Sequence, residues 1–327
     1  MRYRDFGNLG YKVSALGFGA MRLPETAAGN VDRDQAVALI RAAVDAGINY
    51  IDTAPLYNRG ESEPVVGEAL SDGYRDRVWL STKNLLAKDD GPTAWRERLE
   101  QQLERLRTSY VDVYHCWGIS WDIFRNRIVA QGLLDAARQA QTDGLFRHLF
   151  FSFHAPAEEF FRLVDTREFA GCTVQYNLID TSLEGGIAYA ASRGMAVVIM
   201  GPVGGGRLAG PSSLLETIPV AAESNAELAL RFVLANPNVH CAISGMSTPA
   251  MLAENVRAAS RPEPLTPEEL AAIASHMEEY HELARLYCTG CNYCQPCPEK
   301  VAIPRVLNLF NLARVYGFEE AARNLYR

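Results

Sequence analysis

Short apolar segments alternate with amphipathic helical segments along most of this 327-residue chain, and the alternation repeats eight times. Parallel strands joined by helices pair through right-handed crossovers, so this repeat favours a closed (β/α)8 TIM barrel of the α/β class over an open sheet. The expected strands are residues 13–19, 48–52, 78–83, 111–117, 148–153, 173–176, 196–200 and 239–243. The expected helices are residues 32–47, 61–70, 93–106, 129–142, 156–164, 183–193, 226–234 and 249–258.

Both ends of the chain carry segments outside this repeat. Residues 2–12 contain a Gly-Asn-Leu-Gly-Tyr turn, which predicts a hairpin before the barrel. A barrel needs about 250 residues, which leaves a long C-terminal remainder. We therefore expect residues 1–262 to form the barrel and residues 263–327 to form a helical, cysteine-rich extension with one long helix and two shorter ones.

Charge and hydropathy limit the partners of the protein. The net charge of −7 and the sequence pI of about 5.5 give no electrostatic support for nucleic-acid binding. No apolar run approaches the roughly 20 residues that span a bilayer, so no membrane association is expected. The N-terminus lacks the apolar core of a signal peptide, which predicts a cytoplasmic protein.

Chemistry in (β/α)8 barrels sits at the carboxyl ends of the strands. Polar residues and glycines recur at these positions in the sequence. The residues at or just beyond the expected strand ends are Gly19, Asp52, Lys83, Trp117, Ser152, His154, Gln175, Gly201, Pro202, Ser244 and Gly245.

A carboxylate, a phenol and an amine come together at two of these strand ends. Asp52 ends one strand, Tyr57 lies in the following loop, and Lys83 ends the next strand. A free phenol titrates near pH ~10, and a close ammonium favours its ionised form. Each residue alone is often a cap or a surface charge, but the three together predict a proton-transfer site in which Lys83 lowers the pKa of Tyr57.

This segment resembles the active-site segment of the aldo-keto reductases. The pattern is met by Asp52, Thr53, Ala54, Tyr57, Ser62, Glu63, Gly67 and Lys83. The resemblance implies a TIM barrel that passes a hydride between NAD(P)H and a small-molecule carbonyl or alcohol. In that reaction Tyr57 exchanges the proton, Lys83 tunes Tyr57, and Asp52 holds Lys83.

The same resemblance implies a dinucleotide extended across the barrel mouth. Gln175 matches a partner of the carboxamide and Tyr176 the ring that stacks on nicotinamide, while the glycine-rich loop after residue 200 folds over the pyrophosphate. Glu254 and Asn255 match a pair that holds adenine. The residues expected to bind the cofactor are Gly19, Ser152, Gln175, Tyr176, Gly201, Pro202, Gly204, Gly206, Ser244, Gly245, Ser247, Glu254 and Asn255.

The segment after the eighth strand bears on the choice of dinucleotide. NADPH-preferring members of the resembled family carry Lys or Arg there, but this chain has Gly245 and Met251 at the matching positions. A phosphate dianion without a basic partner is weakly held, which favours NADH over NADPH. Ser247, Thr248 and a helix N-terminus remain as an alternative cradle for a phosphate.

The fourth catalytic position departs from the family pattern. The family places a His five residues after an Asp at the end of strand four, and counting from Asp112 reaches Trp117. His115 lies two residues earlier, on the same strand face but one layer deeper. Three assignments stay open: His115 serves, Trp117 has replaced it, or His154 takes over the role.

Four cysteines cluster in the tail as Cys288-x2-Cys291-x2-Cys294-x2-Cys297, followed by Pro. This spacing resembles the ferredoxin motif, apart from a last gap of two, and predicts one [4Fe-4S] cluster. A subgroup of aldo-keto reductases carries such a tail. A zinc site is the alternative, since four thiolates also form a tetrahedral site. The other cysteines, Cys116, Cys172 and Cys241, are expected in the core.

The cluster leaves two further functions open. It is either a structural staple or a redox centre, and a redox centre would call for an electron-transfer partner. The alternatives to a simple reductase are an iron-sulfur enzyme with altered chemistry on the same scaffold and a non-catalytic redox sensor.

Overall fold

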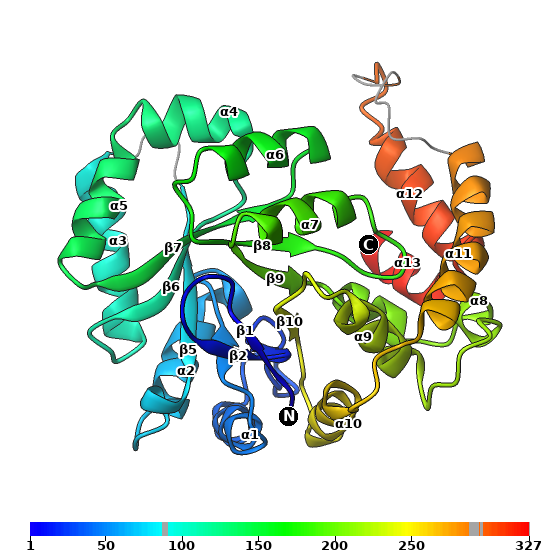
Figure 1. Ribbon diagram of the computed structural model, residues 1–327, viewed down its shortest axis with the longest axis horizontal. Coiled ribbons are helices and arrows are strands. Elements are labelled where there is room, and N and C mark those ends of the chain that lie inside the picture. The colour runs from blue at the N-terminus through cyan, green and yellow to red at the C-terminus, as the bar shows by residue number, and fades with distance from the viewer. Residues whose placement is uncertain (87–90, 288–293, 295–296, 327) are drawn as a thin grey trace.

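A computed structural model describes residues 1–86, 91–287, 294 and 297–326 of the chain (Figure 1). Eight parallel strands form a closed barrel in the order β10-β3-β4-β5-β6-β7-β8-β9. The prediction of a (β/α)8 barrel is confirmed. The strands are β3 (Leu16–Gly19), β4 (Tyr50–Asp52), β5 (Trp79–Asn84), β6 (Val111–Cys116), β7 (Phe146–Phe153), β8 (Gly171–Gln175), β9 (Ala196–Met200) and β10 (Cys241–Ser244).

The expected N-terminal hairpin is also present. Strands β1 (Tyr3–Asp5) and β2 (Lys12–Ser14) pair antiparallel, with Tyr3 opposite Ser14. The segment 13–19, expected as one strand, divides between β2 and β3, because the chain turns from the hairpin into the barrel at Ala15. Phe6, in the hairpin loop, contacts Tyr50, Trp79 and Phe150 edge-on or tilted. The hairpin thus closes the amino-terminal end of the barrel.

Helices surround the barrel at the expected places. They are α1 (Arg33–Asp45), α2 (Ser62–Ala69), α3 (Pro92–Arg105), α5 (Leu133–Thr142), α6 (Ala157–Asp165), α7 (Glu184–Ser192), α9 (Asn225–Ala235) and α10 (Pro249–Ser260). Local capping explains several starts: the side chains of Asp32, Ser224 and Thr248 each accept a backbone N–H of the following helix.

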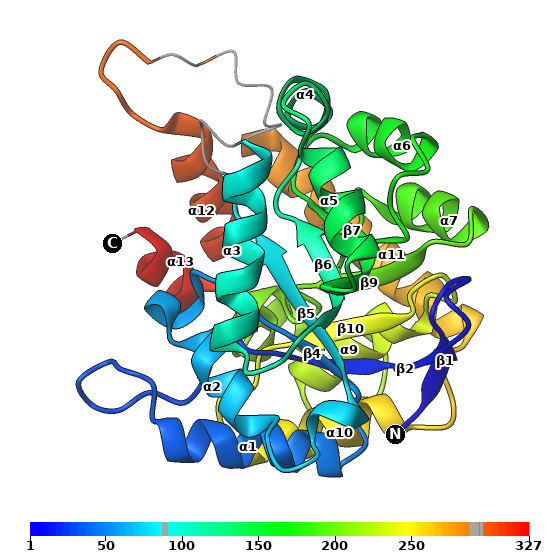
Figure 2. The same cartoon turned by 90° about the vertical axis from the view of Figure 1, so that its left-hand side faces the viewer.

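Short helices that the sequence did not predict lie in several connections. The β6–α5 connection holds α4 (Trp121–Ile123) and a π-helical turn over Phe124–Val129, and α4 lies beside α6 in both views (Figures 1 and 2). The backbone N–H of Trp121 donates to the Glu159 side chain of α6 over 2.7 Å. The β9–α9 connection holds α8 (Ser213–Glu216).

Side chains alternate between the barrel interior and the shell beneath the helices, as the period of a strand requires. The interior cluster comprises Phe6, Val13, Tyr50, Trp79, Val113, Phe150, Ala196, Val198, Cys241 and Ile243. A larger cluster fills the space between the strands and the helices. Residues two positions beyond the interior residues, such as Asp52, therefore also face inward.

The C-terminal extension consists of α11 (Pro267–Tyr287), α12 (Ile303–Arg314) and α13 (Glu319–Tyr326), which stand beside α8 and α9 (Figure 1). The expected three helices are confirmed. His276 of α11 hydrogen-bonds the carbonyl of Leu214 over 3.1 Å, and Ile273 and Met277 join the main core. A division of the chain at residue 262 remains a prediction.

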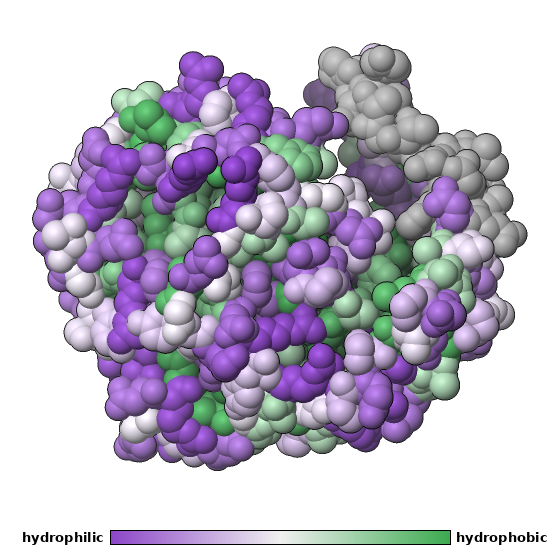
Figure 3. All heavy atoms as spheres, viewed as in Figure 1, coloured by the Kyte–Doolittle hydropathy of each residue, from purple (hydrophilic) through white to green (hydrophobic). Residues whose placement is uncertain are grey.

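The outer surface is mostly polar on the face shown in Figure 3, with scattered apolar patches. Among the helices that the structure describes, none combines the length and hydropathy that a bilayer span requires.

Candidate active site

Asp52 and Lys83 form a buried ion pair at the carboxyl end of the barrel. They end the neighbouring parallel strands β4 and β5, and their side chains are only 4% and 3% exposed. Lys83 Nζ donates to Asp52 Oδ2 over 2.6 Å and to the Thr53 carbonyl over 2.8 Å. Ser81 Oγ donates to the other carboxylate oxygen over 2.8 Å. The structure therefore brings Asp52 and Lys83 together as expected, with a buried carboxylate for a buried ammonium.

Tyr57 approaches this pair from the loop after β4. It begins a short 3-10 turn, and the next two residues, Asn58 and Arg59, have left-handed φ values of 48° and 56°. The Lys83 ammonium lies 4.8 Å from the centre of the Tyr57 ring. Each of the two groups acts on the pKa of the other, so the three residues form one connected group.

The environment acts on both titratable partners of this group. Burial raises the pKa of Tyr57, and the Lys83 charge lowers it by less, so its net direction is upward. The expected lowering of the Tyr57 pKa by Lys83 is present, but the desolvation of the phenolate outweighs it. For Lys83, burial lowers the pKa, but Asp52 and Tyr57 together raise it above its ordinary value of 10.5. Lys83 thus stays an ammonium and Tyr57 a neutral acid.

These directions predict a pH dependence that differs between the two directions of catalysis. Reduction needs the protonated phenol, so its kcat/KM should stay flat from about pH 6 to about pH 10. Alcohol oxidation needs the phenolate, so its kcat/KM should rise about tenfold per pH unit over that range. Replacing Lys83 with Met removes the effect that lowers the pKa and should move the rise to higher pH. An oxidation rate independent of pH would contradict the assignment of Tyr57.

Trp117 occupies the barrel mouth beside Tyr57. Its ring lies edge-on to the Tyr57 ring, with centroids 6.0 Å apart and planes at 88°. Its backbone N–H donates to the Asn84 carbonyl, which fixes the residue just beyond the end of β6. Of the three candidates for the fourth catalytic position, Trp117 is the one in ring contact with Tyr57.

His115 lies inside the barrel rather than at its mouth. It is fully buried, and its Nε2 lies 2.8 Å from the Thr173 hydroxyl. Its Nδ1 lies 3.3 Å from the Thr82 carbonyl. Burial and then the Lys83 charge hold its pKa well below the usual range, so it is neutral. Because both ring nitrogens contact groups inside the barrel, the geometry favours Trp117 over His115 for the fourth catalytic position. His154 is exposed just after β7.

The loop after β9 has the backbone of a ligand cradle. Gly201, Gly204, Gly205 and Gly206 all have positive φ, between 56° and 89°. Asn177 Nδ2 donates to the Gly201 carbonyl over 3.0 Å, which ties the start of this loop to the end of β8. Nothing lies within 4 Å of the place where a side chain at Gly206 would begin. This open, left-handed loop fits the close approach of a phosphate group.

Other expected cofactor residues gather at the same end of the barrel. Ser244 ends β10, and its hydroxyl accepts from the Asn255 amide over 3.0 Å. The Glu254 carboxylate accepts from the Ser224 hydroxyl. Ser152 at the end of β7 accepts the N–H of Gly118 over 2.8 Å and so holds the loop that follows Trp117. Pro202, Gly245 and Ser247 lie in the loops after β9 and β10.

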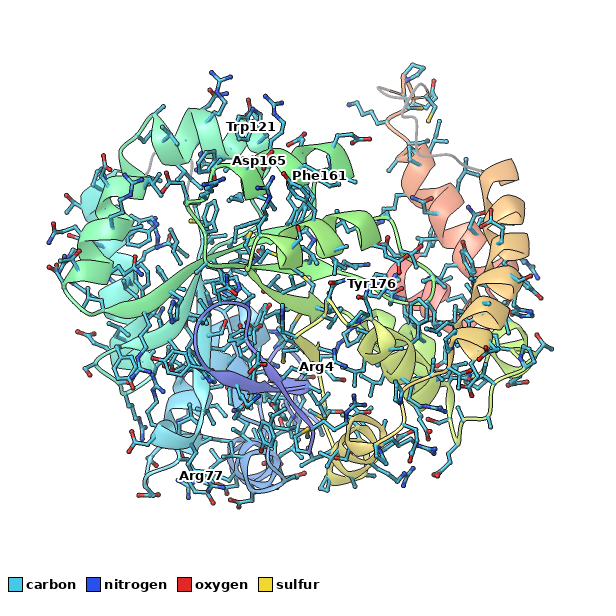
Figure 4. The ribbon with its side chains drawn as sticks, viewed as in Figure 1. Arg4, Arg77, Trp121, Phe161, Asp165 and Tyr176 are labelled. Atoms are coloured by element: carbon cyan, nitrogen blue, oxygen red, sulfur yellow. The ribbon has the colours of Figure 1, made fainter. Side chains whose placement is uncertain are left out.

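One of the expected cofactor contacts is corrected, and the contact at Gly19 stays a prediction. Tyr176 faces away from the barrel mouth, because inward-facing Gln175 precedes it and strand residues alternate. Its ring stacks on Phe232 at 5.4 Å, and its hydroxyl donates to Glu184 (Figure 4). Gly19 is needed for barrel packing, since a Cβ there would lie 2.8 Å from Ile243 Cγ2.

The cysteines divide as the sequence suggested. Cys116, Cys172 and Cys241 are buried, and burial raises the pKa of the Cys116 thiol to about 12. Cys294 is exposed and Cys297 partly exposed, while Cys288 and Cys291 lie outside the described residues. Within residues 1–86, 91–287, 294 and 297–326, no group of three or more His, Cys, Asp or Glu side chains is placed to hold a metal ion.

Ser81 is a site residue that the sequence interpretation missed. Its hydroxyl donates to Asp52 and lies 3.4 Å from Nδ1 of His115, so it links the ion pair to the buried imidazole. The signal was present, because Ser81 is two residues before Lys83 and must share its inward face.

Comparisons with known proteins agree with this geometry. Residues 15–278 match the family model described as the aldo/keto reductase family. The chain is 30% identical over 308 residues to the L-galactose dehydrogenase of Arabidopsis thaliana, covering 86% of this chain and 95% of the relative. It is 28% identical over 314 residues to the uncharacterized oxidoreductase YqkF of Bacillus subtilis, covering 85% and 97%.

Solved structures show the same relationship. The holo form of the aldo-keto reductase AKR11C1 from Bacillus halodurans superposes with a TM-score of 0.74 at 27% identity, covering 84% of this chain and 96% of that one. An aldo/keto reductase from Klebsiella pneumoniae in complex with NADP and acetate superposes with a TM-score of 0.70 at 27% identity, covering 82% and 93%. The chain therefore belongs to the aldo/keto reductase family and is an NAD(P)-dependent oxidoreductase.

Proposed function

We propose that this protein moves a hydride between a nicotinamide dinucleotide and the carbonyl or alcohol carbon of a small molecule, with Tyr57 as the acid and base. The observation that carries the proposal is the connected group of Tyr57, Lys83 and Asp52 at the carboxyl end of the barrel. Barrel enzymes perform their chemistry at this end.

Each residue of the group has a distinct task in reduction. When bound, the nicotinamide supplies the hydride that the carbonyl carbon accepts. Tyr57 holds the proton that the carbonyl oxygen takes, and its raised pKa keeps that proton in place at neutral pH. The Lys83 ammonium stabilises the phenolate that remains, and Asp52 together with the Thr53 carbonyl fixes the ammonium. Oxidation of an alcohol reverses these proton positions.

The dinucleotide would be held by the ends of β8, β9 and β10. Inward-facing Gln175 is available to the carboxamide, and the left-handed glycine loop after Gly201 is available to the diphosphate. The adenine would lie near the end of β10 and the helix that follows it, where Ser244, Glu254 and Asn255 are available to it. The residues at 245 and 251 are glycine and an exposed Met, so neither supplies a charge for a 2′-phosphate, which supports NADH.

Trp117 supports a substrate with a flat or sugar-like face. An indole cannot share in proton transfer as an imidazole does, but its face packs well on a ring. Its edge-on contact with Tyr57 places that surface next to the acid. The similarity to a protein named L-galactose dehydrogenase supports the same substrate class.

Transfer of deuterium tests the proposed reaction directly. Reduced dinucleotide labelled at C4 is incubated with the protein and a panel of aldoses, ketoses and aromatic aldehydes, and the alcohols are analysed by mass spectrometry. Deuterium on the alcohol carbon supports the proposal. Binding of the dinucleotide without transfer to any substrate would favour a non-catalytic sensor.

We propose further that Cys288, Cys291, Cys294 and Cys297 hold one [4Fe-4S] cluster, as a structural staple or as a store for one electron. Cys294 and Cys297 support this, because their thiols are at least partly exposed rather than packed in the core like Cys241. The protein would need an electron-transfer partner only if the cluster changes its oxidation state.

Metal analysis separates this proposal from a zinc site. After anaerobic purification we expect about four irons and about four sulfides per chain, with a broad visible absorption and an EPR signal on reduction. Cys294→Ser should lower the iron content severalfold, whereas Cys172→Ala, in the buried core, should leave it unchanged. About one zinc per chain without sulfide would establish the alternative site.

A further inference from the structure

Arg22 crosses the mouth of the barrel between two glycine loops. It follows β3 by three residues and is exposed. A Cβ at Gly245, after β10, would lie 3.3–3.5 Å from the Cδ, Cβ and Cγ atoms of Arg22. A Cβ at Gly205, after β9, would lie 3.3 Å from its Nη2. The aliphatic stem therefore rests on the Gly245 backbone, and the guanidinium ends over the glycine loop.

The guanidinium has no anionic partner among the described residues. Arg22 makes no hydrogen bond or ion pair with any residue that the structure describes. Other cations at this end of the barrel do have partners. Lys83 is paired with Asp52, and Arg207 Nε donates to the Gly204 carbonyl over 2.7 Å. Arg22 thus presents a full set of donors at the loop whose left-handed glycines form an open cradle.

We infer that Arg22 binds the diphosphate of the dinucleotide against the loop at Gly204–Gly206. The inference rests on the proposed function and adds a binding residue just after β3, which is not among the cofactor positions expected from the sequence. A guanidinium binds phosphate oxygens through two parallel N–H bonds, a geometry that suits a diphosphate.

The position of the guanidinium selects the diphosphate over a 2′-phosphate. The charged end lies at Gly205, whereas only the stem lies at Gly245, which leads towards Ser247 and the first turn of α10. A group bound at Gly205 is shared by NADH and NADPH. Arg22 should therefore contribute equally to both, and the preference between them should not depend on it.

Direct binding measurements test this role. Dissociation constants for NADH and NADPH are determined from protein fluorescence for the intact chain and for Arg22→Gln and Arg22→Lys. We expect Arg22→Gln to weaken both by a similar factor of about 10–100, and Arg22→Lys to recover part of the loss. Inorganic pyrophosphate should compete with NADH on the intact chain and far less on Arg22→Gln. Arg138→Gln, on the distant helix α5, should change nothing.

Three results would overturn the assignment. Unchanged affinities in Arg22→Gln would remove Arg22 from the binding site, and a loss confined to NADPH would assign it to the 2′-phosphate. An intact chain that bound neither dinucleotide would refute the proposed function itself and this role with it. Equal circular dichroism and Tm for the variants would show that any loss is not due to unfolding.

Discussion

We expect replacement of Tyr57 by Phe to lower kcat by about 10²–10⁴-fold and to leave the dinucleotide affinity nearly unchanged. The Tyr57 ring lies beside the Lys83 ammonium. The hydroxyl is the only difference between the Tyr and Phe side chains. Loss of the hydroxyl removes the proton donor, while the ring can still contact Trp117. Stopped-flow measurement of a single turnover would place the loss in the chemical step.

A second tyrosine provides the matched control. Tyr74 donates its hydroxyl to Asp45 over 3.1 Å on the outside of the barrel. Tyr74→Phe should therefore retain full activity. Turnover of Tyr57→Phe at the rate of the intact enzyme would show that another group supplies the proton, and exposed His154 would be the first to examine.

We expect replacement of Asp52 by Asn to destabilise the fold by about 3–5 kcal/mol and to abolish activity. Asn keeps the shape of Asp52 but leaves the Lys83 ammonium buried without a countercharge, since its other acceptor is the neutral carbonyl of Thr53. Lys83 must then either lose its proton or expose itself to water, and Tyr57 loses its cation in both cases. Urea denaturation of both proteins measures the change in the free energy of unfolding.

The double replacement Asp52→Asn with Lys83→Met separates charge from packing. It removes both ions, so much of the lost stability should return while activity stays absent. The exposed pair of Asp5 and Lys12 is the control, and Asp5→Asn should hardly change unfolding. A single Asp52→Asn variant as stable as the intact protein would contradict a buried ammonium at Lys83.

The barrel and the catalytic group could be predicted because both rest on local patterns. Strand-helix alternation gave the order of elements, and strand ends located Asp52 and Lys83 on one edge. The period of a strand also places Ser81 on the same face as Lys83 and turns Tyr176 outward. The family resemblance had placed Tyr176 at the nicotinamide, and this alternation contradicts that position.

Other features depend on three-dimensional neighbours that no local pattern encodes. The strand register sets Lys83 opposite His115, which fixes the depth of the imidazole and leaves the mouth to Trp117. The upward direction of the pKa of Tyr57 depends on how completely the folded chain excludes water from the phenol. In the sequence nothing distinguishes Arg22 from other exposed arginines. Its proposed role depends on the loops at Gly205 and Gly245, which lie beside it only in the folded chain.

The aromatic plug formed by Phe6, Tyr50, Trp79 and Phe150 closes one end of the barrel. Because these buried rings fill the amino-terminal end, we expect the proton that Tyr57 gives up in the proposed reaction to be replaced from the carboxyl end, where the ligands enter. Tyr57 would then regain its proton after the product leaves. Product release and reprotonation would therefore use the same opening of the barrel.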